Sequence, residues 1–274
     1  MKRPKKTGTP LNAKRYEAWL ATFRNYRVPV NNDLIQFWLN QFDAGDRDTA
    51  ARVLDSVLFL DQGHIDSIFR TLLQGMPGWH RFKKNRTGRW YFVAFSRSSG
   101  ESGDTMTHAF RRANGMNTRF FDELFIQRSE IPLKKLGPDD TIILIDDFSG
   151  SGNQACSSWN DVFSELLASG PKAYLMIVAA TRDAEKQIKE KTDMELVCGQ
   201  LLTPSSNFFS SACAYFDQTE KDTILEYCKK ADADNPKGYS DCGLLVVLAH
   251  QAPNNSLPIL TTTNGAWDGL FPRR

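Results

Sequence analysis

The sequence of 274 residues contains few of the side chains that build metal clusters or disulfide frameworks. Its five cysteines, at positions 156, 198, 213, 228 and 242, show no C-x-x-C spacing, and none of the four histidines pairs with a cysteine at metal-ligand spacing. An odd number of scattered cysteines without a secretion signal predicts free thiols in a reducing compartment. These absences argue against a structural zinc site and a disulfide framework, and they favour a cytoplasmic location.

Long apolar segments and a strong charge imbalance are absent as well. No apolar run reaches the roughly 20 residues that span a bilayer, and no apolar signal-peptide core follows the basic start, MKRPKKTGTP. The formal net charge is only +2, so charge gives no reason to expect nucleic acid as a partner. With 41% hydrophobic and 24% charged residues, the composition is that of an ordinary globular protein, and we expect no membrane contact.

The first quarter of the chain carries apolar residues at helical spacing. Four such stripes follow one another, each with members three or four positions apart: Tyr16, Trp19, Leu20 and Phe23; Leu34, Phe37, Trp38 and Phe42; Ala50, Val53, Leu54, Val57 and Leu58; Ile65, Ile68, Phe69, Leu72 and Leu73. Gly75, Pro77 and Gly78 mark the end of this pattern. We therefore expect a helical module with a basic tail in residues 1–78, which could contact a protein partner.

From Trp90 onward, predicted strands alternate with predicted helices. The strands are residues 90–95, 142–145, 174–180, 195–202 and 244–249, and the helices are residues 107–113, 155–167 and 183–191, while residues 121–126 suit either. This alternation predicts an α/β domain in residues 79–274 with a mainly parallel sheet flanked by helices.

The most informative segment is residues 142–154, IILIDDFSGSGNQ. Four branched apolar residues predict a strand buried on both faces, which ends in the adjacent carboxylates of Asp146 and Asp147. The glycines that follow let backbone N–H groups turn toward an anion, and the next helix adds the positive end of its dipole. The segment thus places acceptors for sugar hydroxyls or Mg²⁺ beside donors for phosphate, a pairing that suits a phosphorylated sugar.

This segment resembles the ribose-5-phosphate signature of the type I phosphoribosyltransferases, an apolar strand followed by two acidic residues and a Gly/Ser/Thr loop. The resemblance implies that Asp146 and Asp147 hold the ribose hydroxyls of phosphoribosyl pyrophosphate. It also implies that the loop binds the 5′-phosphate, through Ser149, Gly150, Ser151, Gly152 and Asn153. Mg²⁺ would be the cofactor, with the two carboxylates as indirect ligands.

The segment departs from the family at two positions, and other interpretations stay open. Gly150 stands where many members carry an acidic residue, which argues against proton transfer there, and Gln154 stands where they carry a second Thr. A buried strand with a solvated turn would give the same pattern. A Walker-B strand of an NTPase is a further alternative, but the chain has no G-x-x-x-x-G-K-[ST].

A second polar loop follows the first strand of the predicted sheet. Small residues around one guanidinium suit an oxyanion, and the phosphoribosyltransferases have their pyrophosphate loop at this place. The resemblance therefore assigns pyrophosphate binding to Ser96, Arg97, Ser98, Ser99 and Gly100, with Arg128 as a further basic residue that reaches the pyrophosphate. The alternatives are a flexible turn for the loop and a surface position for Arg128.

The C-terminal stretch, residues 238–274, resembles the end of a divergent bacterial phosphoribosyltransferase-like family. That family is associated with conflict systems, meaning phage defence and toxin-type effectors. Asn254 and Asn255, between Pro253 and Pro258, offer donors and acceptors that suit the edge of a nucleobase, although turn formation explains them equally well.

Three functions follow as expectations. The first is glycosyl transfer at the ribose anomeric carbon of phosphoribosyl pyrophosphate or a nucleotide, assisted by Mg²⁺, in a possible anti-phage effector. The second is a non-catalytic module that senses such a ligand and signals to a protein partner. The third is hydrolysis of the N-glycosidic bond of a nucleotide. A homodimer is compatible with each.

Overall fold

The computed structural model describes residues 11–95 and 102–273 and divides the chain into two compact units. The central unit comprises residues 63–203, and the terminal unit combines residues 1–62 with residues 204–274. This division differs from the boundary expected at residue 78, because the first helices share a hydrophobic core with the C-terminal segment rather than forming a module alone. The chain crosses between the units twice.

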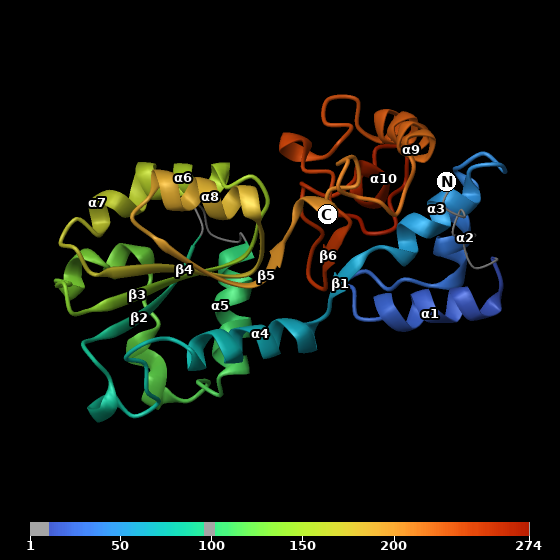
Figure 1. Ribbon diagram of the computed structural model, residues 1–274. Helices are drawn as coiled ribbons and strands as arrows, with labels where there is room; N and C mark the ends of the chain where they lie inside the picture. Colours follow the sequence, from blue (N-terminus) through green and yellow to red (C-terminus); the bar gives the residue numbers. More distant parts are fainter. Residues whose placement is uncertain (1–10, 96–101, 274) are drawn as a thin grey trace. The chain divides into compact units, whose positions relative to one another are not determined.

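The central unit contains a four-stranded parallel sheet (Figure 1). Its strands are β2 (Trp90–Ala94), β3 (Thr141–Ser149), β4 (Lys172–Thr181) and β5 (Glu195–Leu202), in the order β2-β3-β4-β5. Every neighbouring pair is parallel, which confirms the predicted fold class. In such a sheet the carboxyl ends of all strands lie along one edge, where open α/β sheets bind their ligands.

Helices cover both faces of this sheet (Figure 1). They are α4 (Gln62–Gln74) and α5 (Ser102–Ala113) on one face; α6 (Asn153–Ser158), a π-helical turn (Trp159–Phe163), α7 (Ser164–Leu166) and α8 (Arg182–Lys191) cover the other. Phe92 of β2 meets Phe110 of α5 at a ring-centroid distance of 4.8 Å. On the other face, Phe163 of the π-helical turn belongs to a hydrophobic core that includes Leu144 of β3. Successive side chains of a strand thus pack against helices on opposite faces of the sheet.

The segment between α5 and β3 contains only short 3₁₀ turns. They span Arg119–Leu124, Arg128–Glu130 and Pro132–Lys134, and another, Lys83–Asn85, precedes β2. The segment expected at residues 121–126 is therefore neither a regular helix nor a named strand. Phe125 nevertheless forms a single parallel bridge with Phe92, at the outer edge of β2.

The terminal unit is mainly helical, with a short parallel strand pair. Its helices are α1 (Ala13–Phe23), α2 (Asn32–Asn40), α3 (Arg47–Asp55), α9 (Gln218–Ala231) and α10 (Pro258–Thr261), and its strands are β1 (Leu58–Leu60) and β6 (Val246–Leu248). The last predicted strand is thus found, but it pairs with β1 rather than with the central sheet. Leu58, expected on a helical stripe, lies in β1 because of that distant partner.

Aromatic residues from both ends of the chain form the core of the terminal unit. Trp38 and Trp267 both donate their indole N–H to the carbonyl of Ile259, at 2.7 and 2.9 Å. Phe23 meets Phe271 at a ring-centroid distance of 4.9 Å. The prediction that the early aromatic residues form core rather than ligand platforms is confirmed for Trp38 and Phe23, which are 1% exposed.

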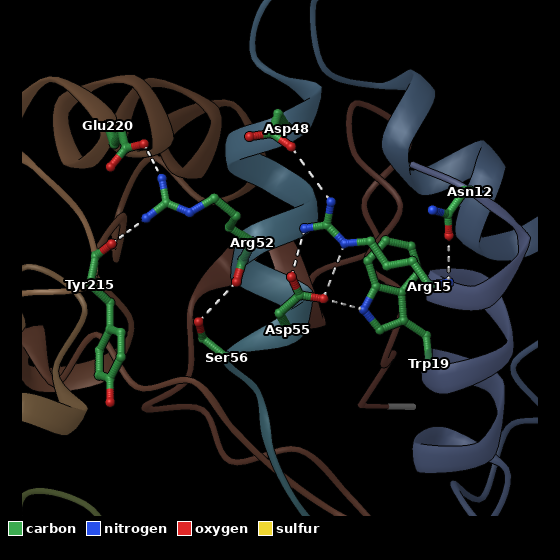
Figure 2. A network of polar contacts seen from close by, with 9 residues as sticks. All are labelled: Asn12, Arg15, Trp19, Asp48, Arg52, Asp55, Ser56, Tyr215 and Glu220. Atoms are coloured by element: carbon green, nitrogen blue, oxygen red, sulfur yellow. Dashed lines mark hydrogen bonds and ion pairs between the residues drawn. The ribbon is translucent and has the colours of Figure 1, made fainter. Parts of the chain in front are cut away.

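A buried guanidinium connects α1 to α3 (Figure 2). Arg15 is 5% exposed and donates to both carboxylate oxygens of Asp55, at 3.2 and 2.6 Å. The same carboxylate accepts the indole N–H of Trp19 at 2.9 Å, whereas Asp48 lies 3.5 Å from Arg15 and is well exposed. Asp55 therefore joins two side chains of α1 to the end of α3, and Asp48 contributes much less.

No helix among residues 11–95 and 102–273 combines the length and the apolar character needed to cross a bilayer.

The replacement Arg15→Ala should lower the free energy of unfolding by about 2–3 kcal/mol, because it removes the bidentate pair and leaves Asp55 without its main partner. The control Asp48→Asn should change it by less than about 0.5 kcal/mol, since an exposed pair contributes little. Urea denaturation followed by tryptophan fluorescence measures both variants. Equal losses in the two variants would contradict the assignment of Arg15.

Candidate functional site

The two candidate carboxylates lie near the carboxyl end of β3. Ile142 to Ile145 of this strand are 0% exposed, and the register aligns Ile145 with Ala94 of β2 and Met176 of β4. Asp146 follows, 8% exposed, and accepts the backbone N–H of Asp147 on its Oδ1 at 2.9 Å. Because side chains alternate along a strand, Asp146 lies on the side of α6 to α8, and the half-buried Asp147 lies on the side of α5.

The strand continues beyond the carboxylates, which the sequence did not predict. Phe148 pairs with Ala179 and Ser149 with Ala180, so the first residue of the expected phosphate loop still belongs to β3. The loop proper is short: Gly150, Ser151 and Gly152, after which α6 begins at Asn153. A loop this short brings the start of α6 directly beside the carboxylates.

The backbone at the start of α6 is open toward an anion. Its N-cap residue is Gly152, with φ of 80° and ψ of −12°, which has no side chain to cap the first turn. Ser151 accepts the N–H of Asn153 on its hydroxyl at 3.3 Å. The dipoles of the first turn and the hydroxyl of Ser151 therefore meet at one place, and this arrangement suits phosphate oxygens.

Contacts from α8 hold this loop in position. Thr181, the N-cap of α8, donates its hydroxyl to the carbonyl of Gly150 and accepts the N–H of Ala184 at 3.0 Å. The side-chain amides of Gln187 and Asn153 hydrogen-bond at 2.8 Å. A Cβ on Gly152 would lie 3.2 Å from the Cα and the carbonyl oxygen of Ala184. Gly152 is therefore required both by its positive φ and by the close approach of α8.

The start of α5 lies at the same edge of the sheet. A Cβ on Gly103 would lie 3.0 Å from the backbone nitrogen of Phe95 and 3.3 Å from the carbonyl oxygen of Ile145. Phe95 in turn donates its N–H to that same carbonyl at 2.8 Å. The absence of a side chain at position 103 thus places the first turn of α5 against the strand end that carries Asp146.

The predicted pyrophosphate loop, Ser96, Arg97, Ser98, Ser99 and Gly100, lies outside the described residues. Before this loop, Phe95 directly follows the end of β2, and after it α5 begins at Ser102. Arg128 is half-buried and lies two residues after Ile126, which donates its N–H to the carbonyl of Phe92 at 3.2 Å. Because this segment runs parallel to β2, Arg128 lies farther toward the carboxyl edge than Phe92.

Asn254 and Asn255, the candidate base contacts, lie in the terminal unit. Asn255 is 5% exposed and donates its side-chain amide to the carbonyl of Tyr239 at 3.0 Å. The carbonyl of Asn254 accepts the N–H of Tyr239 at 2.9 Å. Both residues therefore stabilise the local chain, as the turn interpretation expects, and they do not share a unit with the carboxylate pair.

Thr181 and Gly103 are two site-building residues that sequence reasoning did not single out. Thr181 stood at a predicted strand end directly before a predicted helix, and Thr is one of the residues preferred at an N-cap. Gly103 lies inside α5, and a glycine within a helical pattern often marks a close contact. What the sequence did not show was the partner of each.

The carboxylate pair suits a cation that keeps much of its own hydration. Within residues 11–95 and 102–273, no group of three or more His, Cys, Asp or Glu side chains could hold a metal ion. Mg²⁺ usually binds through one or two carboxylates plus substrate phosphates and water. Asp146 and Asp147 fit that donor set when a phosphorylated substrate supplies the remaining oxygens.

Comparisons with known proteins identify a family and partial likenesses to solved structures. The PRTase-CE family model matches residues 35–273 of the chain. The protein TT1426 from Thermus thermophilus is similar at 16% identity over 45% of this chain and 55% of that one, with a TM-score of 0.21. The chain thus spans just over half of that structure. No curated protein matches the chain.

Replacing Gly152 by Ala should lower the free energy of unfolding by about 2–3 kcal/mol, because the new side chain combines positive-φ strain with a clash against α8. Gly170 is a matched control, since its φ is 78° but nothing lies within 4 Å of a Cβ there. Gly170→Ala should therefore cost only about 1 kcal/mol. Urea denaturation of both variants measures the difference, and equal costs would show that α8 does not constrain the loop.

Proposed function

Because the chain belongs to the PRTase-CE family, we propose that its central unit binds phosphoribosyl pyrophosphate, or a nucleotide, and transfers the phosphoribosyl group. The observation that supports this most is the junction of β3 and α6. It combines two carboxylates with a helix start whose N-cap is a glycine, within a few residues. The carboxylates suit ribose hydroxyls, and the helix start suits the 5′-phosphate.

Substitution at the anomeric carbon passes through a state with oxocarbenium character. The bond from that carbon to the pyrophosphate oxygen breaks, its electron pair leaves with pyrophosphate, and the acceptor bonds to the carbon. Asp146 and Asp147 orient the ribose, and their negative charge favours the positive charge that develops on the ring. Held by Thr181 and α8, the loop anchors the 5′-phosphate, so the ribose is fixed at both ends.

Mg²⁺ would be held near Asp146 and Asp147, mostly by substrate oxygens and water. When bound, it would neutralise the charge that collects on the departing pyrophosphate. Arg128 and the loop of residues 96–100 would contribute further positive charge and backbone donors to the same pyrophosphate.

The double variant Asp146→Asn with Asp147→Asn should lose binding of phosphoribosyl pyrophosphate with Mg²⁺ by at least about a hundredfold, because both ribose acceptors lose their charge. Calorimetric titration measures the affinity, and circular dichroism checks that the fold is retained.

The control for this pair is Glu190→Gln with Asp193→Asn, which makes the same charge change at exposed positions, one in the last turn of α8 and one just beyond it. Its affinity should stay within about twofold of the original, since exposed charges at a distance are screened. Unchanged binding in the Asp146/Asp147 variant would refute the assignment of the site.

Gly150 favours a second candidate, a module that binds the ligand without turning it over. This residue is buried, its carbonyl accepts the hydroxyl of Thr181, and no acidic side chain follows Asp147 in the loop. Proton transfer to an acceptor base therefore has no evident donor on this loop. Pyrophosphate release measured with a panel of bases, and with water alone, separates transfer and hydrolysis from sensing. Binding without any release would select the sensing function.

A further inference from the structure

A basic pocket lies at the amino end of β2, away from the carboxyl edge that carries Asp146. It encloses about 530 Å³ including its opening to solvent, and its lining residues include Gly88, Arg89, Trp90 and Tyr91. From Trp90 to Ala94, the strand rises four residues, or ~13 Å at 3.3 Å per residue. The pocket is therefore separate from the strand end at which Asp146 lies.

Positive charge dominates the lining of this pocket. Lys83, Arg86, Arg89 and Lys134 contribute four cations, against the single carboxylate of Glu123. The guanidinium of Arg89 makes hydrogen bonds within the protein: it donates to Asp140 at 2.6 Å and to the carbonyls of Lys134 and Lys135. The three other cations decide what the pocket can bind.

These three cations keep donors available for a ligand. Arg86 donates Nε to the carbonyl of His80 at 2.7 Å and Nη2 to that of Arg81 at 2.8 Å, so its Nη1 has no hydrogen-bond partner among the described residues. Its guanidinium stacks over the ring of Trp79, 4.5 Å from the centroid, and this fixes its plane. Burial lowers the pKa of Arg86, while the charge of Glu123 opposes that shift.

The ion pairs of Lys83 and Lys134 are weak. Lys83 meets Glu123 at 3.3 Å in a pair whose side chains are 73% and 60% exposed, and Lys134 lies 3.9 Å from Glu130. Such exposed or long pairs are worth little, so an incoming anion can compete for both ammonium groups. Lys134 also lies over the ring of Tyr91, 5.7 Å from its centroid.

Three exposed apolar side chains lie close in the sequence to residues that line this pocket. Phe82 is 56% exposed, Phe120 63% and Leu133 77%, and they lie within three residues of the lining residues Lys83, Glu123 and Lys134. Among the described residues of the central unit, these are the large apolar side chains that are exposed. Phe82, which precedes the lining residue Lys83, is the aromatic residue among them that is nearest in sequence to the pocket.

We propose that this pocket binds the phosphate group of a nucleotide-class ligand, with Arg86, Lys83 and Lys134 on the phosphate oxygens and the neighbouring apolar side chains against the base. A fixed guanidinium and two mobile ammonium groups match an oxyanion of more than one negative charge. Exposed aromatic rings match a planar base. The phosphate can belong to a free nucleotide or to a nucleic-acid strand, since both present the same chemistry.

The test uses the double variant Lys83→Gln with Lys134→Gln and a matched control, Lys84→Gln with Lys135→Gln. Each control residue is the sequence neighbour of a pocket lysine and lies outside the pocket lining, so the two variants make the same charge change in the same segments. The probes are ADP and a ten-nucleotide oligothymidylate. Fluorescence anisotropy of labelled probes gives the affinity, and hydrogen–deuterium exchange locates the protected segments.

The pocket variant should weaken binding of the preferred probe by about tenfold or more, and the control should stay within about twofold. Exchange should slow in residues 80–91 and 123–135, and it should slow equally in the Asp146/Asp147 double variant, so failure of the proposed catalytic site leaves this result intact. Tighter binding of ADP would identify a free nucleotide, and tighter binding of the oligomer a strand. Equal losses in the two lysine variants, or no protection of these segments by either probe, would overturn the proposal.

Discussion

The parallel pairing of β3 on both sides is the constraint on which the candidate site depends. Because β2 and β4 flank it and helices cover both faces, Ile142 to Ile145 are fully buried and cannot shift register without exposing apolar surface. The position of Asp146 follows directly from that fixed register. Its burial is tolerable because the carboxylate sits at the edge of the sheet and accepts a backbone N–H.

Two glycines then decide how close the helices come to this strand end. Gly103 lets the first turn of α5 rest on the backbone of Phe95 and Ile145, and Gly152 lets the loop of residues 150–152 rest on α8. Both contacts involve backbone atoms, so a side chain at either place would separate the layers. The edge of the sheet is thus closed by helix starts on both faces, and their positive dipole ends lie beside two carboxylates. The basic pocket at the amino end of β2 adds positive charge at the opposite edge.

Local patterns predicted most of the central unit. The strands were recognised from their apolar runs, and the predicted bounds 195–202 match β5 from end to end, although this edge strand is largely half-exposed and includes Glu195 and Gln200. The helix after the carboxylates was predicted from its apolar spacing. Its π-helical turn at Trp159–Phe163 was not predicted, because whether a helix takes up an extra residue in one turn depends on how it packs. Helix α9 was not predicted at all, although Asp217 and Glu220 form a capping box at its start.

The sequence by itself determined the α/β class, the strand that carries Asp146 and Asp147, and the glycine-rich connection after it, because each depends on residues close together in the chain. Only the tertiary structure decided which segments share a core. Leu58 is in a strand because β6 pairs with it, and the side-chain amide of Asn255 donates to the carbonyl of Tyr239. These partners are distant in sequence, and no local periodicity encodes them. The division into a central and a terminal unit follows from such long-range contacts, as does the fixing of the loop of residues 150–152 by Thr181.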